Sequence, residues 1–338
     1  MVNVAFLAPL GTYTHQAALQ QFPEDKHTTF TPVDSISKCF QELMTNKELD
    51  FAVVPLENST NGQVVFTYDI LRDLMNNSDT YQENEAVPML EIVAEQYVSI
   101  DLCLIASKPL NLNSLTKETK LEIHSHPQVW GQAANYLKLL EQKVSALHKI
   151  DASSTSAAVR LCCEMEGEEQ GGVISLAVGS SIAAKAHNGF VLDSRINDKK
   201  GNTTRFLILK RRNSQGPPLE ARPFSPLAND QMVSILTFVV KQDSPGSLVD
   251  VLNVLKEHRI NMCSITSRPY HFPKDDRIQL TPENEEGRWR KWQYIFFVEV
   301  THDNRLDWAP VLKGIRSNSM RFCFWGTLHR NGRYYDIT

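Results

Sequence analysis

A polar, proline-rich stretch at residues 211–229 divides the chain into two unequal regions. Between positions 216 and 226 it holds one glycine and four prolines, which interrupt the regular apolar patterns on either side. Such a composition is typical of a linker between domains. We therefore predict a first region at 1–212, a linker at 213–230 and a second region at 231–338, and we expect each region to fold by itself.

The first region alternates strand-like apolar runs with helical patterns, which favours a layered α/β domain. The apolar run at 93–107 is long for one strand, and we expect it to carry the chain into a second lobe, from which a strand at 204–210 returns. Two lobes joined by two crossings form a hinged cleft that suits a small ligand. We place lobe one at about 1–100 and 190–212 and lobe two at about 101–189.

The second region predicts a strand–helix–strand–strand–helix–strand order, which is the ferredoxin-like βαββαβ motif. Two polar segments are predicted to lie on the surface. Residues 76–90 are interpreted as a surface insertion of the first region, and residues 275–290 as a long hairpin loop of the second. The strands of the second region are expected at 232–240, 262–268, 294–300 and 321–326, and its helices at 247–258 and 306–315.

Composition excludes several classes of protein. The chain is 42% hydrophobic and 22% charged, and no apolar run approaches the roughly 20 residues that a membrane helix needs. The net charge is −4 and basic residues gather only in short clusters, so no nucleic-acid surface is expected. The N-terminus enters a strand-like run without a basic leader, and the six cysteines form no C-x-x-C pair. These features favour a cytoplasmic protein with reduced thiols.

Common motifs for nucleotides, metals and serine hydrolases are missing from the sequence. It contains no G-x-G-x-x-G, no Walker loop, no H-E-x-x-H and no G-x-S-x-G. We therefore expect neither a cofactor nor a metal ion.

Four polar clusters lie where predicted strands end and helices begin, the positions at which α/β sheets bind ligands. In the first, Gly-Thr-Tyr-Thr at 11–14, a tight turn brings hydroxyl groups to a helix N-terminus. That arrangement suits an anion, and it equally suits a plain helix cap. The second cluster, at 55–62, crowds a carboxylate, two amides and two hydroxyls into one loop after a buried strand. A polar surface loop is the alternative interpretation.

The third cluster, at 124–132, contains two histidines. Ser125 and Gln128 have the spacing of a capping box, so a helix cap explains part of the motif, and without a third ligand nearby zinc is not expected. In the fourth cluster, at 201–206, Arg205 stands among small polar donors. An arginine fork suits a carboxylate, and a surface salt bridge is the alternative.

Taken together, these clusters resemble the prephenate dehydratase family, most closely its fungal members. The second region resembles the ACT regulatory domain that follows in this family, with 245–249 at a Gly-Ala-Leu-Val type loop and 266–269 at a Glu-Ser-Arg-Pro motif. Ser247 and Thr266 depart from these motifs. The departures affect the expected effector site and leave the expected catalytic function unchanged. In the first region the matching segments occur in the family's order at 11–18, 55–62, 125–132, 153–158 and 202–206.

The resemblance implies a two-lobed, periplasmic-binding-protein-like catalytic domain followed by a ferredoxin-like ACT domain. It implies a carbon–oxygen lyase that converts prephenate to phenylpyruvate in phenylalanine biosynthesis without a cofactor. It also implies feedback by phenylalanine through the ACT domain, and a homodimer or homotetramer.

The same resemblance assigns roles to particular residues. Thr204 would hydrogen-bond the departing hydroxyl, and His126 is the other plausible acid. The other implied catalytic residues are Glu57, Asn58, Ser125 and Gln132. The implied substrate-binding residues are Thr12, Tyr13, Thr14, Ser59, His126, Arg205 and Phe206. The implied effector-binding residues are Gly246, Ser247, Leu248, Val249, Asn261, Ser267, Arg268 and Pro269.

Two other functions stay open at this point. Arogenate dehydratases share the motifs and differ in acting on a substrate with an amino group. A ligand-binding sensor without catalytic activity would also use two hinged lobes, although the Thr-Arg-Phe motif at 204–206 argues for an enzyme.

Overall fold

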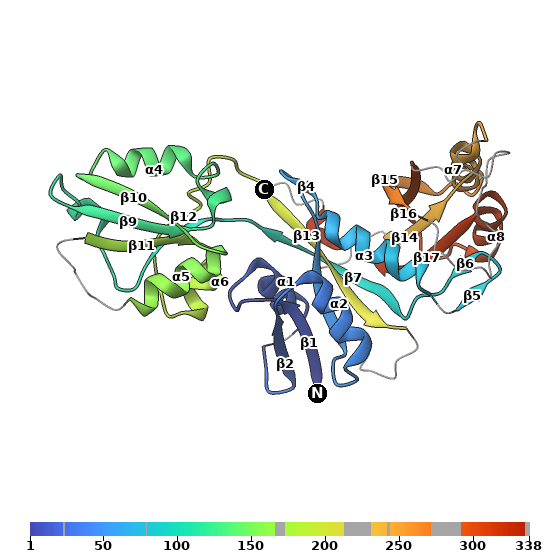
Figure 1. Cartoon of the computed structure of the whole chain (residues 1–338), viewed down its shortest axis with the longest axis horizontal. Helices are drawn as coiled ribbons and strands as arrows, with labels where there is room; N and C mark the ends of the chain where they lie inside the picture. The colour runs from blue at the N-terminus through green and yellow to red at the C-terminus, as the bar shows by residue number, and fades with distance from the viewer. Residues whose placement is uncertain are drawn as a thin grey trace.

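The computed structural model describes residues 1–22, 24–78, 80–165, 173–212, 231–241, 244–271 and 292–334. Three bodies follow one another across the molecule: lobe two at one end, lobe one in the middle and the C-terminal domain at the other end (Figure 1). The predicted linker and the predicted hairpin loop lie outside the described residues. Within the described residues, no helix is both long enough and apolar enough to cross a membrane.

Lobe one is built on a mixed sheet in the order β2-β1-β3-β13-β7, with β4 beside β3. Helix α1 covers one face through Ala17 and Ala18, while α2 buries Cys39, Phe40 and Leu43 against the other. The elements are β1 (Val2–Leu7), α1 (Tyr13–Gln21), β2 (Thr28–Val33), α2 (Ile36–Thr45), β3 (Phe51–Asn58), β4 (Gly62–Gln63), α3 (Val65–Asn76), β7 (Leu90–Ser99) and β13 (Thr203–Arg211).

Lobe two has a separate five-stranded sheet in the order β10-β9-β11-β8-β12. The expectation that one long apolar run enters a second lobe is confirmed, because β7 passes directly into β8 and β13 returns the chain to lobe one (Figure 1). Between β9 and β10 the chain forms a short 3-10 turn and then a separate α-helix. The elements are β8 (Cys103–Ala106), β9 (Lys120–Ser125), the 3-10 turn Pro127–Val129, α4 (Ala134–Glu141), β10 (Ala146–Asp151), α5 (Thr155–Glu164), β11 (Val173–Gly179), α6 (Ser181–Ala186) and β12 (Phe190–Ser194).

The C-terminal domain has the predicted βαββαβ order. Its four long strands lie side by side as β15-β16-β14-β17, and its two helices pack together over one face. The elements are β14 (Gln231–Val239), α7 (Ser247–Glu257), β15 (Asn261–Tyr270), β16 (Gln293–Asp303), α8 (Trp308–Asn318) and β17 (Arg321–His329).

The segment at 76–90 is not the free surface insertion that its polar composition suggests. It forms β5 (Tyr81–Gln82) and β6 (Glu85–Ala86), and β6 pairs in parallel with β17 of the C-terminal domain. The Asn84 side chain donates to the carbonyl oxygens of Arg316 and Ser319, at 2.9 and 2.7 Å. The polar residues of this segment therefore bind the C-terminal domain. Composition alone cannot show whether polar residues contact another domain or water.

Lobe one and the C-terminal domain share one hydrophobic core. Leu56, Tyr68 and Leu207 of lobe one belong to the same buried cluster as Phe297 and Trp325 of the C-terminal domain. This shared core does not fit the expectation that residues 1–212 form a self-sufficient fold, because separation would expose both sides of the cluster to water.

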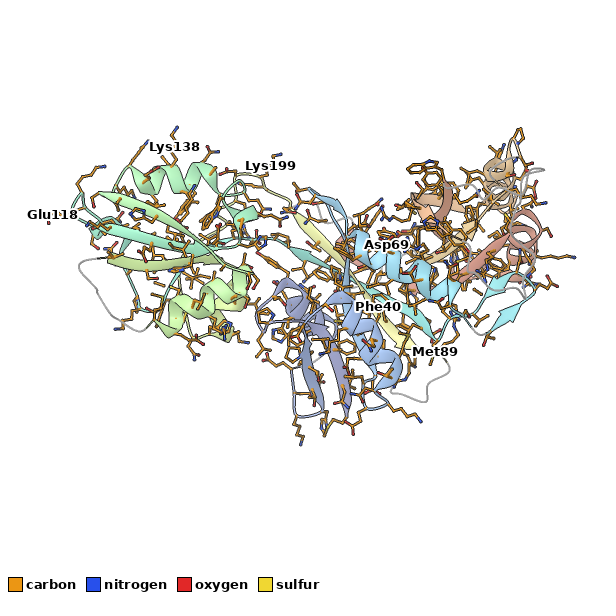
Figure 2. The ribbon with its side chains drawn as sticks, in the orientation of Figure 1. Phe40, Asp69, Met89, Glu118, Lys138 and Lys199 are labelled. Carbon is orange, nitrogen blue, oxygen red and sulfur yellow. The ribbon has the colours of Figure 1, made fainter. Side chains whose placement is uncertain are left out.

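Two further features hold this interface together. A Cβ added at Gly326 of β17 would lie 2.5 Å from the carbonyl oxygen of Ile92 on β7, so only glycine allows the two strands to approach so closely. On the other side of the interface, Arg268 of β15 forms two hydrogen bonds of 2.9 and 3.0 Å to Asp69 of α3, which is labelled in Figure 2.

Candidate active site

Thr204 and Asn58 meet where β13 enters lobe one and β3 ends. The two strands pair so that Thr204 lies opposite Asn58, and Asn58 Nδ2 lies 3.0 Å from Thr204 Oγ1 and 2.7 Å from Asn202 Oδ1. The other side-chain atom of Asn58, Oδ1, accepts from the backbone N–H groups of Thr60 and Asn61. The amide orientation is therefore fixed from both ends. Because Thr204 Oγ1 accepts a hydrogen bond from this amide, its own hydroxyl hydrogen points elsewhere and can be donated.

Ser59 ties the same loop to the start of β13. Its hydroxyl donates to the carbonyl oxygen of Gly201 at 3.3 Å and accepts from the N–H of Thr203 at 2.9 Å. These two contacts use its donor hydrogen and one acceptor lone pair, so Ser59 ties down the loop that carries Asn58.

Arg205 points away from the cleft between the lobes and into the interface with the C-terminal domain. Its guanidinium pairs with Glu57 at 3.0 Å, with Glu95 at 2.7 Å and with Glu299 of the C-terminal domain. Burial opposes the charge, but the carboxylates of Glu95 and Glu299 more than offset this and raise the pKa of Arg205 well above its usual range. The prediction that Arg205 binds a substrate carboxylate does not fit this placement, because three protein carboxylates already surround its guanidinium.

The turn after β1 is where lobe one contacts lobe two. Gly11 has a φ of +80°, and a Cβ there would lie 2.7 Å from the Cα of Ala183 on α6. Ser180 donates to the carbonyl oxygen of Gly11 at 3.0 Å, and Ser156 donates to that of Leu10. These polar contacts between the lobes are few compared with the apolar core behind lobe one.

Several predicted substrate-binding residues have structural roles. Thr12 caps α1 by accepting from the N–H of His15 at 3.2 Å, and its hydroxyl donates to the carbonyl oxygen of Leu7. Thr14 is buried, and Phe206 belongs to the apolar cluster beneath α1. The alternative interpretation of residues 11–14 as a helix cap is therefore correct for Thr12.

The predicted residues of lobe two lie at the end of β9. Ser125 is fully buried and donates to the carbonyl oxygen of Val178 at 2.7 Å. His126 caps the following 3-10 turn, because its Nδ1 accepts from the N–H of Gln128 at 3.3 Å. The backbone of Gln132 accepts from the N–H of Asp198 at 2.7 Å, which joins the start of α4 to the segment that returns to lobe one.

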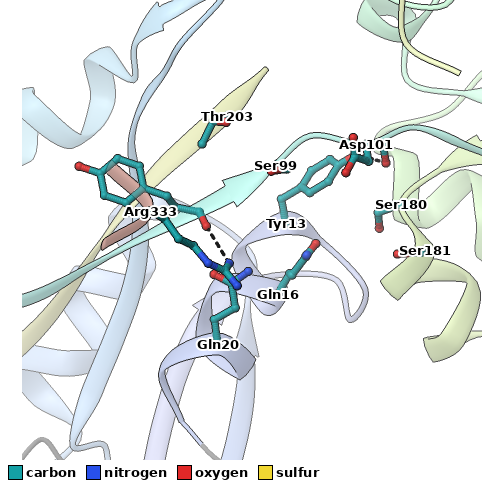
Figure 3. A pocket seen from close by; sticks show the side chains of 10 residues that line it. Tyr13, Gln16, Gln20, Ser99, Asp101, Ser180, Ser181, Thr203 and Arg333 are labelled. Atoms are coloured by element: carbon teal, nitrogen blue, oxygen red, sulfur yellow. Dashed lines mark hydrogen bonds between the residues drawn. The ribbon is translucent and has the colours of Figure 1, made fainter. Parts of the chain in front are cut away.

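A polar pocket of about 300 Å³ lies between the lobes, beside the two crossing strands (Figure 3). Tyr13 is the only predicted site residue in its lining; Thr203 lines it, and Thr204 does not. Burial raises the pKa of Tyr13, so its phenol stays neutral, and its hydroxyl donates to the carbonyl oxygen of Asp101 at 3.4 Å. The rest of the lining is Gln16, Gln20, Tyr97, Ser99, Asp101, Ser180, Ser181 and Arg333.

Sequence reasoning missed Arg333. It follows the last strand of the C-terminal domain, and it is the sole cationic side chain among the described residues that line the pocket (Figure 3). One of its Nη atoms donates to the carbonyl oxygen of Tyr97 at 3.2 Å. Nothing near position 333 in the sequence marks a ligand site, because the residue reaches the pocket only through the packing of the C-terminal domain on lobe one.

A family model for prephenate dehydratase matches residues 4–214 of the chain. The chain belongs to the prephenate dehydratase family. It is 42% identical over 348 residues to the probable prephenate dehydratase of Saccharomyces cerevisiae, an alignment that covers 99% of this chain and 98% of that protein. It is 30% identical over 299 residues to the bifunctional chorismate mutase/prephenate dehydratase of Aquifex aeolicus, covering 88% of this chain and 65% of that longer protein.

The likeness to prephenate dehydratases extends to solved structures. Prephenate dehydratase from Arthrobacter aurescens in complex with L-Phe superposes with a TM-score of 0.69 at 22% identity, and the match covers 98% of this chain and 90% of that one. At this identity the likeness bears on the fold alone, which includes both the two lobes and the C-terminal domain.

In this member of the prephenate dehydratase family, the predicted effector residues fall into three places. The first group lies at the start of α7, where Gly246 has a φ of +88° and Val249 is exposed. Asn261 lines a separate groove of about 420 Å³ between α7 and β15. Ser267, Arg268 and Pro269 lie on β15 at the interface with lobe one, where Arg268 pairs with Asp69.

Ligands for a metal ion do not gather anywhere in the described part of this family member. No group of three or more histidine, cysteine, aspartate or glutamate side chains there has the arrangement of a metal site. The six cysteines are free thiols, and burial raises the pKa of Cys39 to about 12 and that of Cys162 to about 11.

Proposed function

We propose that this chain converts prephenate to phenylpyruvate, with Thr204 as the hydrogen-bond donor to the departing hydroxyl. The observation that carries the proposal is the contact between Asn58 Nδ2 and Thr204 Oγ1. A hydroxyl that accepts a hydrogen bond becomes a better donor, because the bonds in a chain polarise one another. Family membership and the 42% identity to the probable prephenate dehydratase of yeast support the assignment of the reaction.

The reaction balances without a cofactor. The ring carboxylate of prephenate leaves as carbon dioxide, and the electron pair of the broken carbon–carbon bond enters the ring. The ring then expels its 4-hydroxyl, which takes up one proton and leaves as water, so that the ring becomes aromatic. A hydrogen bond from Thr204 strengthens as negative charge develops on the departing oxygen, and it therefore stabilises the transition state more than the bound substrate.

The polar pocket between the lobes is our proposed site for the rest of the substrate. It has the volume expected for a small-molecule site, and Thr203 in its lining is the chain neighbour of Thr204. Arg333 supplies a positive charge for a carboxylate. We therefore assign to Arg333 the carboxylate-binding role that the sequence suggested for Arg205.

Turnover of purified protein tests the reaction directly. We expect phenylpyruvate to form from prephenate, and arogenate to react more slowly if at all. Thr204→Val keeps the shape of the side chain and should lower kcat about 10²–10⁴-fold, the usual range for losing a positioned proton donor. KM should change little, because the pocket residues remain.

Thr29→Val is the matched control, since Thr29 is an exposed residue of a distant strand. This substitution should leave kcat within twofold of the wild-type value. A folded Thr204→Val enzyme that is as active as the control would remove Thr204 from the mechanism, and His126→Asn would then be the next variant to measure.

Phenylalanine is the proposed effector, and the C-terminal domain the proposed ACT domain. The groove lined by Asn261 is large enough for an amino acid, and the Arthrobacter relative binds L-Phe. We propose that Asn261 hydrogen-bonds the effector in this groove, in a cytoplasmic enzyme that is at least dimeric. Asn261→Ala should raise the phenylalanine concentration for half-maximal inhibition about tenfold, the effect of losing one good hydrogen bond. Sedimentation of the full chain tests the dimer.

A further inference from the structure

Five charged side chains form one buried cluster between lobe one and the C-terminal domain. Lobe one contributes Arg205, Glu57 and Glu95, and the C-terminal domain contributes Glu299 from β16 and Arg330 from the end of β17. Apart from Glu57, each of these side chains is at most 8% exposed.

Glu299 contacts both guanidiniums of this cluster. It accepts from an Nη atom of Arg205, and its other oxygen accepts from Nη2 of Arg330 at 2.6 Å. Burial alone would raise the pKa of Glu299, but the two guanidiniums hold it below the usual range, so the side chain is ionised at neutral pH. Of the three carboxylates that pair with Arg205, Glu299 is the one from the C-terminal domain, so it ties the guanidinium to that domain.

The position of Arg205 matters because its neighbours in the chain form the candidate site. Arg205 follows Thr204 on β13, and Glu57 precedes Asn58 on β3; Arg205 lies opposite Glu57 in the strand pairing, just as Thr204 lies opposite Asn58. The pairing has a register shift immediately after Arg205. The ion pair between Glu57 and Arg205 adds a side-chain restraint at this point, beside the hydrogen bonds that hold Asn58 and Ser59.

We propose that Glu299 is a positioning residue for catalysis: by holding Arg205 against Glu57, the C-terminal domain sets the contact between Asn58 and Thr204. The domain thus completes the catalytic site as well as carrying an effector site. This inference rests on the proposed function, since it uses the role of Thr204 in prephenate dehydration.

The test is kinetic and uses the full chain. Glu299→Gln keeps the size of the side chain and removes its charge; we expect kcat with prephenate to fall about tenfold while KM stays within twofold. Glu299→Asp keeps the charge, and it should recover most of the loss. If the glutamine variant does not fold, the aspartate variant still tests the proposal, with an expected two- to fivefold fall in kcat.

A double variant separates positioning from loss of stability. In a Thr204→Val background, Glu299→Gln should cause no further fall in kcat, because there is no longer a hydroxyl to position. A purely structural role for Glu299 would instead lower activity by the same factor in both backgrounds, and that result would overturn the proposal.

Glu85→Gln provides the matched control at the same interface. Glu85 pairs with Arg316 at 3.0 Å across the two domains but lies at the β6 side, away from Thr204, so kcat should stay at the wild-type value. An equal fall in kcat for Glu85→Gln and Glu299→Gln would contradict the inference. Wild-type enzyme that turns over neither prephenate nor arogenate would overturn the proposed function and the inference together, whereas active wild type with an unaffected Glu299→Gln variant overturns the inference alone.

Discussion

Lobe one has two boundaries, and they are built in opposite ways. Its boundary with lobe two consists of two crossing strands and a few hydroxyl-to-carbonyl hydrogen bonds around Gly11. Its boundary with the C-terminal domain contains a shared apolar core and a buried charge cluster. In addition, strand β6 pairs with β17 and so extends the sheet of the C-terminal domain. The first boundary has only a few polar contacts, whereas separation at the second would expose an apolar core to water.

This difference indicates which of the three bodies can move relative to lobe one. Lobe two can rotate about the crossing strands at small cost, which is how a two-lobed site closes on its ligand. Lobe one and the C-terminal domain must move as one body. A signal from the proposed effector site would therefore have a rigid route to β13 and need no separate docking step.

Truncation after Arg212 should have the largest effect among the tests of the difference between the two boundaries. The shared core would then lose about a third of its members, at about 1.5–3 kcal/mol for each fully buried large apolar side chain. We expect the fragment to be insoluble or to lack a cooperative melting transition. A soluble and active fragment would show that the two domains are self-sufficient after all. Soluble yield and thermal unfolding followed by circular dichroism give the answer.

Gly326→Ala tests the tight boundary at one point. Its φ of +140° is essentially a glycine conformation, and the added methyl group would collide with the carbonyl oxygen of Ile92. We expect the free energy of unfolding to fall by about 3 kcal/mol. Gly62→Ala is the control for the cost of a positive φ without a collision, because Gly62 has a φ of +79° and no atom near the new methyl group. In a urea titration this substitution should lower the free energy of unfolding by about 1 kcal/mol.

Gly11→Ala tests the loose boundary. The methyl group would press on α6 at Ala183 and hold the lobes apart, so we expect kcat/KM for prephenate to fall about tenfold. The loss of stability should be only about 1–2 kcal/mol, the cost of a left-handed backbone for alanine. If Gly11→Ala destabilised the protein as much as Gly326→Ala did, the two boundaries would be equivalent and the contrast would fail.

The pH dependence of stability is the smallest expected effect. The pKa of Glu299 is lowered in the folded protein, so its contribution to stability is complete above the ordinary pKa of glutamate, about 4.3. That contribution is lost as the pH falls from there towards the lowered value. Melting temperatures should therefore decrease as the pH is lowered below about 4.3, and Glu299→Gln should show a smaller decrease over that range. Identical slopes would exclude Glu299 as the titrating group.

Much of the fold could be predicted from local patterns. Apolar residues at helical spacing identified α2, and the strand and helix order of the C-terminal domain could be read from alternating runs. Strand β2 escaped prediction because it is a short edge strand that contains Pro32. Strand β10 is largely exposed and carries little apolar signal.

The candidate site was predicted less completely, because sequence patterns do not give the direction of a side chain. The pairing of Thr204 with Asn58 follows from two motifs that both lie at strand ends. The partners of Arg205 lie 94 to 148 positions away, at Glu299 and Glu57, and nothing local links them. Within an otherwise apolar strand, Glu299 has the pattern of a solvent-facing residue, yet that side of the strand is an interface.

The docking of β5 and β6 also limits how two copies of the chain can join. An open sheet has two outer strands, and either could pair with a second molecule. In the C-terminal domain, β6 covers β17, and the outer position on that side falls to β5, which is only two residues long. The opposite outer strand, β15, spans ten residues. A dimer formed by continuing this sheet from one copy into the next would therefore be joined at β15.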